Sequence, residues 1–179
     1  MATPAGPRRT GGARRHGGPV VVLGIDPGSQ ATGYGLIDCA RRDHRYRDAG
    51  VIRPPRGAPL ASRLLVLHER IAAAIDAHHP DLVAVESLFH ARSPRTAITL
   101  GHARGVILLA CAQRGIEVAD YTPLEIKQSV TGRGDASKEQ VHAMLCRLIA
   151  APQDLAHDAS DALAVALCHA HRVLDRVMP

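Results

Sequence analysis

Residues 20–26 read VVVLGID, and this stretch decides the fold. Its unbroken run of apolar, β-branched side chains is typical of a strand that is buried on both faces and lies at the centre of a sheet. Two more strand-like segments follow, ATGYGLIDC at 31–39 and HRYRDAGVIR at 44–53. Short polar turns separate the segments, so the three together predict an antiparallel meander.

After residue 58 the pattern alternates between amphipathic helices and short apolar strands. Ser93 followed by Pro94 is a typical N-cap and first-turn pair, and it sets the start of a long helix. The predicted strands are DLVAVES at 81–87 and IEVADY at 116–121, and the predicted helices cover 59–78, 93–114, 123–130, 137–150 and 158–177. This order predicts an α/β domain with a five-stranded mixed sheet, in which three antiparallel and then two parallel strands are flanked by helices.

The 179 residues are enough for one domain with a sizeable core. That core must be almost free of aromatic rings, because the chain holds one Phe, three Tyr and no Trp. Residues 1–19 are rich in Gly, Pro and Arg without an apolar face, which predicts a disordered tail. We therefore expect one folded domain over 20–179.

The net charge of +5 comes largely from four arginines in residues 1–19. Without them the chain carries 18 basic against 17 acidic side chains, so any nucleic-acid binding must use a local patch. The tail itself is either a solvated extension or a loose phosphate-binding arm.

The cysteines and the apolar segments exclude several classes of protein. The four Cys are isolated in the sequence, which argues against a zinc module or a disulfide framework and fits a reducing cytosol. The longest apolar stretch, 105–112, is far shorter than the roughly 20 residues that span a bilayer. We expect a cytoplasmic protein.

Two carboxylates stand at the ends of predicted apolar strands, Asp26 and Glu86. A charge at the tip of a buried strand is costly unless it is paired, solvated or bound to a cation, and the tips of central strands are where sites form in α/β sheets. Either residue alone could equally be an acid that caps a neighbouring helix.

Asp158 and Asp161 add two carboxylates on one face of a predicted helix. Small neighbouring side chains allow this helix to approach another element closely, although Asp158 alone could be an acid favoured by the helix dipole. Four carboxylates on three elements are the oxygen ligands that Mg²⁺ prefers, and they indicate nuclease or polymerase chemistry.

Five motifs in order identify a resemblance that covers most of residues 20–171. The sequence resembles the RuvC Holliday-junction resolvases in GIDPGSQATGYGLID at 24–38, VAVESLF at 83–89, LGHARGV at 100–106, IKQSVTGRGDASKEQV at 126–141 and DASDALAVALCHAH at 158–171. The resemblance implies an RNase H-like nuclease domain, a homodimer, and resolution of four-way DNA junctions by paired symmetric nicks in recombination and repair.

The same resemblance implies a role for the carboxylates and the partners. Asp26, Glu86, Asp158 and Asp161 match the family's catalytic metal ligands, with two Mg²⁺ ions per active site and Mn²⁺ as a substitute. Cleavage would leave 5′-phosphate and 3′-hydroxyl ends, and branch-migration proteins of the RuvA and RuvB type would be partners.

A second set of residues is expected to contact DNA: Phe89, Arg92, Lys127, Arg133 and Lys138. The two lysines are the only ones in the chain and flank a Gly-rich turn, where they suit phosphate contacts, although ordinary surface lysines would look the same. Phe89 lies outside any apolar pattern and beside cations, which suits stacking on an unpaired base, with packing on the body as the alternative.

Three features modify the expected site. His157 precedes Asp158 and is an auxiliary candidate that orients a carboxylate, helps to activate water or contacts the metal in some states. The alternative is a histidine that is simply exposed at the start of the helix. Ser87 and Ser93 stand where many relatives carry Gln and Asn, which bears on DNA contacts more than on chemistry. The helix at 93–114, with VILLACA at 106–112, Gly101 and Gly105, is the candidate dimer interface. The alternative is ordinary packing on the sheet, and one helix could do both with opposite faces.

Three other functions are compatible with parts of the sequence. An RNase H-like nuclease for another structured nucleic acid would keep the carboxylates. An actin-like or sugar-kinase-like ATPase would use GIDPGSQATGYGLID as a phosphate-binding hairpin, but 179 residues leave no room for its second lobe. A catalytically silent junction-binding protein is disfavoured by the intact carboxylates.

Overall fold

The computed structural model describes residues 18–28, 30–40, 43–87 and 93–174. Its strands are β1 (Val20–Asp26), β2 (Thr32–Ala40), β3 (Asp43–Ile52), β4 (Leu82–Glu86) and β5 (Val118–Tyr121). Its helices are α1 (Leu60–His78), α2 (Pro94–Ala112), α3 (Pro123–Thr131), α4 (Lys138–Leu148) and α5 (His157–Val173). The order of elements predicted from the sequence is confirmed.

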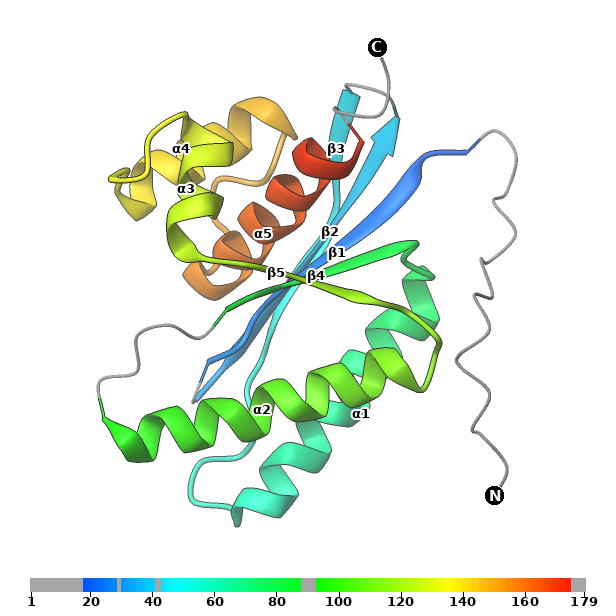
Figure 1. Cartoon of the computed structure of the whole chain (residues 1–179), viewed down its shortest axis with the longest axis vertical. Coiled ribbons are helices and arrows are strands. Elements are labelled where there is room, and N and C mark those ends of the chain that lie inside the picture. The colour runs from blue at the N-terminus through cyan, green and yellow to red at the C-terminus, as the bar shows by residue number, and fades with distance from the viewer. Residues whose placement is uncertain (1–17, 29, 41–42, 88–92, 175–179) are drawn as a thin grey trace, which may run out of the picture.

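The five strands form one mixed sheet in the order β3-β2-β1-β4-β5. β1 pairs antiparallel with β2, and β2 with β3, while β4 is parallel to both β1 and β5. This is the predicted arrangement of three antiparallel and then two parallel strands. In Figure 1 the sheet lies between a layer of α1 and α2 and a layer of α3, α4 and α5.

β1 supplies both halves of the core, because successive side chains of a strand point to opposite faces. Leu23 and Ile25 are fully buried among residues of α1 and α2, whereas Val22 is buried on the side of α5. The core is aliphatic, as the composition predicts. VVVLGID therefore forms a central strand that is buried on both faces, as its sequence predicts.

Glycines let α5 lie almost on the backbone of the sheet. A Cβ atom on Gly24 would lie 2.1 Å from the carbonyl oxygen of Ala162, and one on Gly35 would lie 2.7 Å from the backbone nitrogen of Leu163. Real Cβ atoms do not approach that closely, so larger residues would push the helix away. The predicted close approach of this helix is confirmed.

Several predicted boundaries were wrong by a few residues. α2 ends at Ala112, α4 at Leu148 and α5 at Val173, each before its predicted end, while α5 begins one residue early and β5 two residues late. After α4 the chain turns through Ala150 at a φ of 55°, which stops the helix. Residues 1–17 of the predicted tail lie outside the described residues.

No helix within the described ranges is long and apolar enough to cross a membrane.

Candidate functional site

Two of the predicted carboxylates lie side by side where parallel strands end. Ile25 of β1 is in register with Val85 of β4, so the next residues, Asp26 and Glu86, meet at the same edge of the sheet. Burial, followed by the charges of Glu86 and other nearby carboxylates, raises the pKa of Asp26 to about 8. Burial also raises the pKa of Glu86, although a hydrogen bond with Asp26 partly opposes the shift. This edge concentrates more negative charge than it can hold ionised.

α5 brings the other two carboxylates to the same edge. Gly33 pairs with Asp26 across β1 and β2, and a Cβ on Gly33 would lie 1.8 Å from the carbonyl oxygen of Asp158. The start of α5 is thereby seated over the end of β1. Asp161 follows one turn later on the same face, and both helix carboxylates raise the pKa of Asp26. The structure therefore brings all four predicted carboxylates together.

Lys138 supplies the positive charge that this cluster lacks. Ser137 caps the N-terminus of α4, which fixes Lys138 in the first turn of the helix. Its ammonium group donates a hydrogen bond to Asp161. Partial burial lowers the pKa of Lys138, but its interactions with Asp161, Asp26 and Glu86 outweigh this and raise the pKa overall. Lys138 therefore stays charged and faces the carboxylates.

Lys127 approaches from a different helix. α3 starts with a capping box between Thr122 and Glu125 and ends at Gly132, whose φ is 77°. The charge of Lys127, half-buried on this helix, lowers the pKa of Glu86. The sequence places Lys127 near the Gly-rich turn, and in the structure its charge is also close enough to Glu86 to interact with that carboxylate.

The remaining predicted residues do not all join the cluster. Arg133 is exposed and forms an ion pair with Asp135 at 3.0 Å. His157 is exposed at the first residue of α5, and its charge helps to lower the pKa of Glu139, after the hydrogen bond from Ser137. Phe89 and Arg92 lie outside the described residues.

The two serines that depart from the family pattern have local structural roles. The Ser87 hydroxyl donates to the carbonyl oxygen of Tyr121 at 3.0 Å and links the ends of β4 and β5. Ser93 is the N-cap of α2, as predicted, and accepts a hydrogen bond from the Thr96 backbone at 3.2 Å.

Sequence reasoning missed Arg53. This residue directly follows β3, and its guanidinium lies 3.8 Å from the Asp158 carboxylate. Its side chain is 62% exposed, so this cation sits at the open side of the cluster. The available signal was a basic residue at the end of the third strand of the predicted meander, but that strand pairs with β2 and not with β1, so the contact with Asp158 could not be read from the strand order.

The donor set suits a hydrated divalent cation. Within the described residues, no group of three or more His, Cys, Asp or Glu side chains forms a ready-made metal cage. Mg²⁺, however, keeps several waters and is held through one or two carboxylates rather than by an all-protein cage. The carboxylate oxygens fit such an ion, as do the burial and the neighbouring negative charges that raise the pKa of Asp26.

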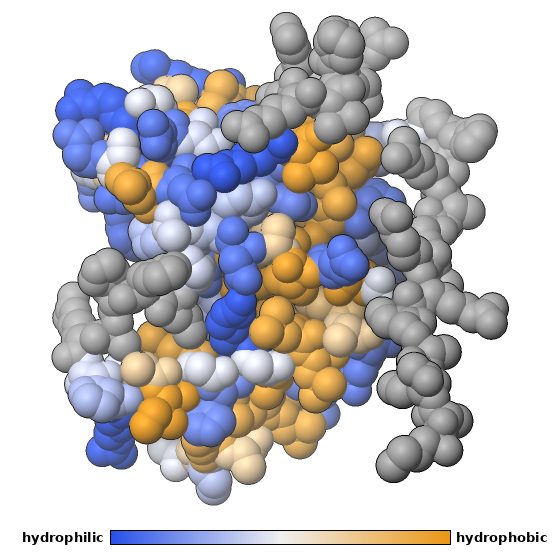
Figure 2. Space-filling view, viewed as in Figure 1, coloured by the Kyte–Doolittle hydropathy of each residue, from blue (hydrophilic) through white to orange (hydrophobic). Residues whose placement is uncertain are grey.

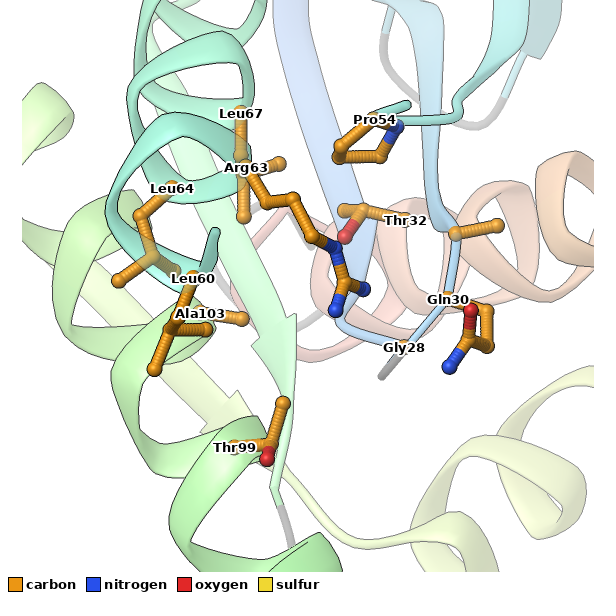
Figure 3. Close-up of a pocket in the computed structure, with 11 residues that line it drawn as sticks. Gly28, Gln30, Thr32, Pro54, Leu60, Arg63, Leu64, Leu67, Thr99 and Ala103 are labelled. Atoms are coloured by element: carbon orange, nitrogen blue, oxygen red, sulfur yellow. The ribbon is translucent and has the colours of Figure 1, made fainter. Parts of the chain in front are cut away.

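A small pocket lies behind the loop that follows Asp26. Figure 3 shows Arg63 reaching from α1 toward Thr32, Gly28 and Gln30, with Thr99 of α2 also lining the pocket. The cavity measures about 20 Å³, which is room for about one water molecule. The cavity is therefore too small for a ligand.

Comparison with known proteins gives consistent matches along most of the chain. The family model described as "Crossover junction endodeoxyribonuclease RuvC" matches residues 22–169. Curated proteins of that description are similar to this chain: the one from Halorhodospira halophila is 49% identical over 150 residues, with 84% of this chain and 89% of the relative covered. The one from Pelotomaculum thermopropionicum is 44% identical over 153 residues, covering 85% and 93%.

A solved structure agrees with these matches. "T. thermophilus RuvC in complex with Holliday junction substrate" superposes with a TM-score of 0.79 at 32% identity, covering 84% of this chain and 93% of that one. The RNase H-like fold predicted from the resemblance is confirmed.

Proposed function

Because the chain belongs to the RuvC family of crossover junction endodeoxyribonucleases, we propose that it resolves four-way DNA junctions by paired, symmetric nicks. The observation that carries the proposal is the convergence of Asp26, Glu86, Asp158 and Asp161 at one sheet edge, faced by Lys138. Oxygen ligands flanked by cations suit hydrolysis of a phosphodiester. The products would carry 5′-phosphate and 3′-hydroxyl ends.

The four carboxylates would hold two Mg²⁺ ions, with Mn²⁺ as a substitute. When bound, such ions supply an activated water and stabilise the charge that develops on the leaving oxygen. Asp26 must lose its proton before it can serve as a ligand. Its pKa of about 8 opposes that loss at neutral pH. The charge of Lys138 lowers the pKa of Asp26 and would offset part of the negative charge of the cluster before the substrate binds.

DNA would be positioned by groups around the carboxylates. Lys127 and Lys138 would contact phosphates near the cleaved bond, and Arg92 and Arg133 would extend these contacts. Phe89 would stack on an unpaired base at the junction centre. His157 is assigned an auxiliary role at the carboxylates.

Two symmetric cuts require two sites, and a two-fold dimer supplies them. α2 exposes Ile98 and Leu109, which are 62% and 51% accessible. Gly101 and Gly105 lie between them at helical spacing, and nothing in the described chain lies within 4 Å of a Cβ added to either. Figure 2 shows apolar residues across the lower half of the view, where α2 crosses in Figure 1. We assign the dimer contact to this stripe.

Only part of the predicted VILLACA segment is available for that contact. Ile107, Ala110 and Cys111 are buried within the subunit, while Leu109 points outward. One face of α2 thus packs on the sheet and the other would meet the second copy. By family resemblance, cytoplasmic branch-migration proteins of the RuvA and RuvB type would deliver the junction during recombination and repair.

A substrate panel tests the proposal. The protein is incubated with end-labelled four-way junction, plain duplex of the same sequence and an RNA–DNA hybrid, each with Mg²⁺ or with a chelator. We expect paired nicks in the junction alone, and only with the metal. Equal cutting of duplex would indicate a general nuclease, cutting of the hybrid an RNase H-type activity, and neither result is compatible with a resolvase.

A further inference from the structure

A groove of about 760 Å³ runs between α1 and the β2–β3 pair, apart from the carboxylate cluster. Val51 and Val66 form apolar walls, and Tyr34 lines the groove beside Gly50. A Cβ on Gly50 would lie 2.7 Å from the Tyr34 hydroxyl, so the glycine makes room for the ring. The groove therefore combines an aromatic ring with apolar sides.

One end of the groove opens at the catalytic edge. Arg53 lines the groove and also lies 3.8 Å from the Asp158 carboxylate. From Arg53 to Asp48 along β3 is five residues, or about 17 Å at the rise of a strand. From Val66 to His78 along α1 is twelve residues, or about 18 Å. The groove thus extends from the site along both elements for a similar length.

The charges along the groove are ordered. Arg53 stands at the catalytic end, and exposed Arg70 projects from α1 into the middle. Arg70 makes no ion pair with the described residues, but its charge acts on the Tyr34 side chain. At the far end Asp48 accepts from Tyr34 and lies 3.2 Å from His78 Nε2. The groove is positive near the site and closed by a carboxylate away from it.

We propose that this groove holds the backbone of the DNA strand that continues from the cleaved phosphate, with phosphates at Arg53 and Arg70. A basic track beside an aromatic ring is the chemistry that binds a nucleic-acid strand independently of its sequence. Asp48 repels phosphate and ends the track. The inference rests on the proposed function, because the strand enters the groove from the site.

The salt dependence of junction binding tests this inference. Binding is measured with Asp26→Asn protein, which is expected not to cut, carrying Arg70→Ala, Arg70→Lys or no further change. Loss of one phosphate contact lowers the magnitude of the slope of log affinity against log salt by about 0.9. The affinity of the Asp26→Asn parent relative to that of the protein that also carries Arg70→Ala should therefore fall about 3.5-fold between 50 and 200 mM salt. Arg70→Lys should retain the slope.

Arg45→Ala is the matched control, because Arg45 lies near the other end of β3 in an exposed ion pair with Asp43. Its slope should equal that of the parent. A second measurement uses junctions with uncharged methylphosphonate linkages beside the cleavage position. These linkages should weaken binding of the junction to the parent but should have little further effect on its binding to the Arg70→Ala protein. Such non-additivity is expected if the Arg70 guanidinium contacts the replaced phosphates.

An unchanged slope for Arg70→Ala, or full additivity with the methylphosphonates, overturns the inference even if the junction is bound and cut normally. Failure of the wild-type chain to bind or cut the junction would instead refute the proposed function, and the groove assignment with it. The methylphosphonate result on the Asp26→Asn parent does not depend on whether any Arg70 variant folds.

Discussion

The ammonium group of Lys138, in the first turn of α4, donates a hydrogen bond to the carboxylate of Asp161 on α5. The contact joins residues 23 apart in the chain and places a fixed positive charge against the carboxylate cluster. The same charge lowers the pKa of Asp26 and of Glu86. Lys138 therefore helps to keep the carboxylates ionised.

Replacing Lys138 by Ala should slow junction cleavage by about 100-fold at neutral pH, because one preorganised charge is lost from the site. The pH midpoint of cleavage should also move upward, because Asp26 then holds its proton more tightly. Single-turnover rates from pH 6 to 9 measure both effects. Arg147→Ala, in the exposed last turn of α4, is the control. An unchanged cleavage rate and an unchanged pH midpoint would show that Lys138 has no role in cleavage.

The raised pKa of Asp26 predicts a pH-dependent stability of the metal-free protein. The unfolded carboxyl titrates near its ordinary 3.8 and the folded one at about 8, so the folded state binds the proton more tightly. The stabilisation is complete below the lower value and is lost as the pH rises to the upper one. In chelator, wild-type Tm should fall between pH 5 and 8 relative to that of Asp26→Asn. Parallel Tm curves would contradict the assignment.

Gly24 should not tolerate a side chain. Gly24→Ala should reduce the free energy of unfolding by about 2 kcal/mol, because its Cβ would lie 2.1 Å from the Ala162 carbonyl oxygen and force α5 off the sheet. Denaturant unfolding measures the change, and cleavage should fall with it, because α5 carries Asp158 and Asp161. Gly18→Ala, with nothing within 4 Å, is the control. Equal stabilities would show that the helix is not seated as described.

The exposed stripe of α2 that contains Ile98 and Leu109 predicts that the protein is a dimer. Leu109→Glu should convert a dimer into a monomer in sedimentation experiments, because it places a charge in the proposed contact. Leu65→Glu on α1 is a matched control, since Leu65 is also exposed, at 57% against 51% for Leu109. Monomeric wild type at tens of micromolar, or dimerisation of both variants, would refute the contact.

Much of the fold follows from local patterns. The buried run VVVLGID, the alternation after residue 58 and the cap at Ser93 predict the elements and the mixed sheet. Asp26 and Glu86 could be predicted because a charge at the tip of a buried strand is costly unless it is paired, solvated or bound to a cation. Their shared edge follows from the parallel pairing of β1 and β4.

Other features depend on tertiary register that no local pattern contains. Arg53 reaches Asp158 because β3 ends beside the start of α5, after a shift in pairing at Leu36 and Ile37. The apolar run at the end of α2 did not reveal which side chains face outward, and Leu109 is exposed while Ile107 is buried. Such outcomes depend on where a helix sits on the sheet.

The most direct test of the central claim compares binding and cleavage by Asp26→Asn. Asp38→Asn, on β2 and paired with Arg47 at 3.1 Å, is the matched control. We expect Asp26→Asn to bind the four-way junction about as well as wild type but to make no nicks in Mg²⁺, while Asp38→Asn cuts normally. Normal cutting by Asp26→Asn, or loss of junction binding by the folded variant, would contradict it.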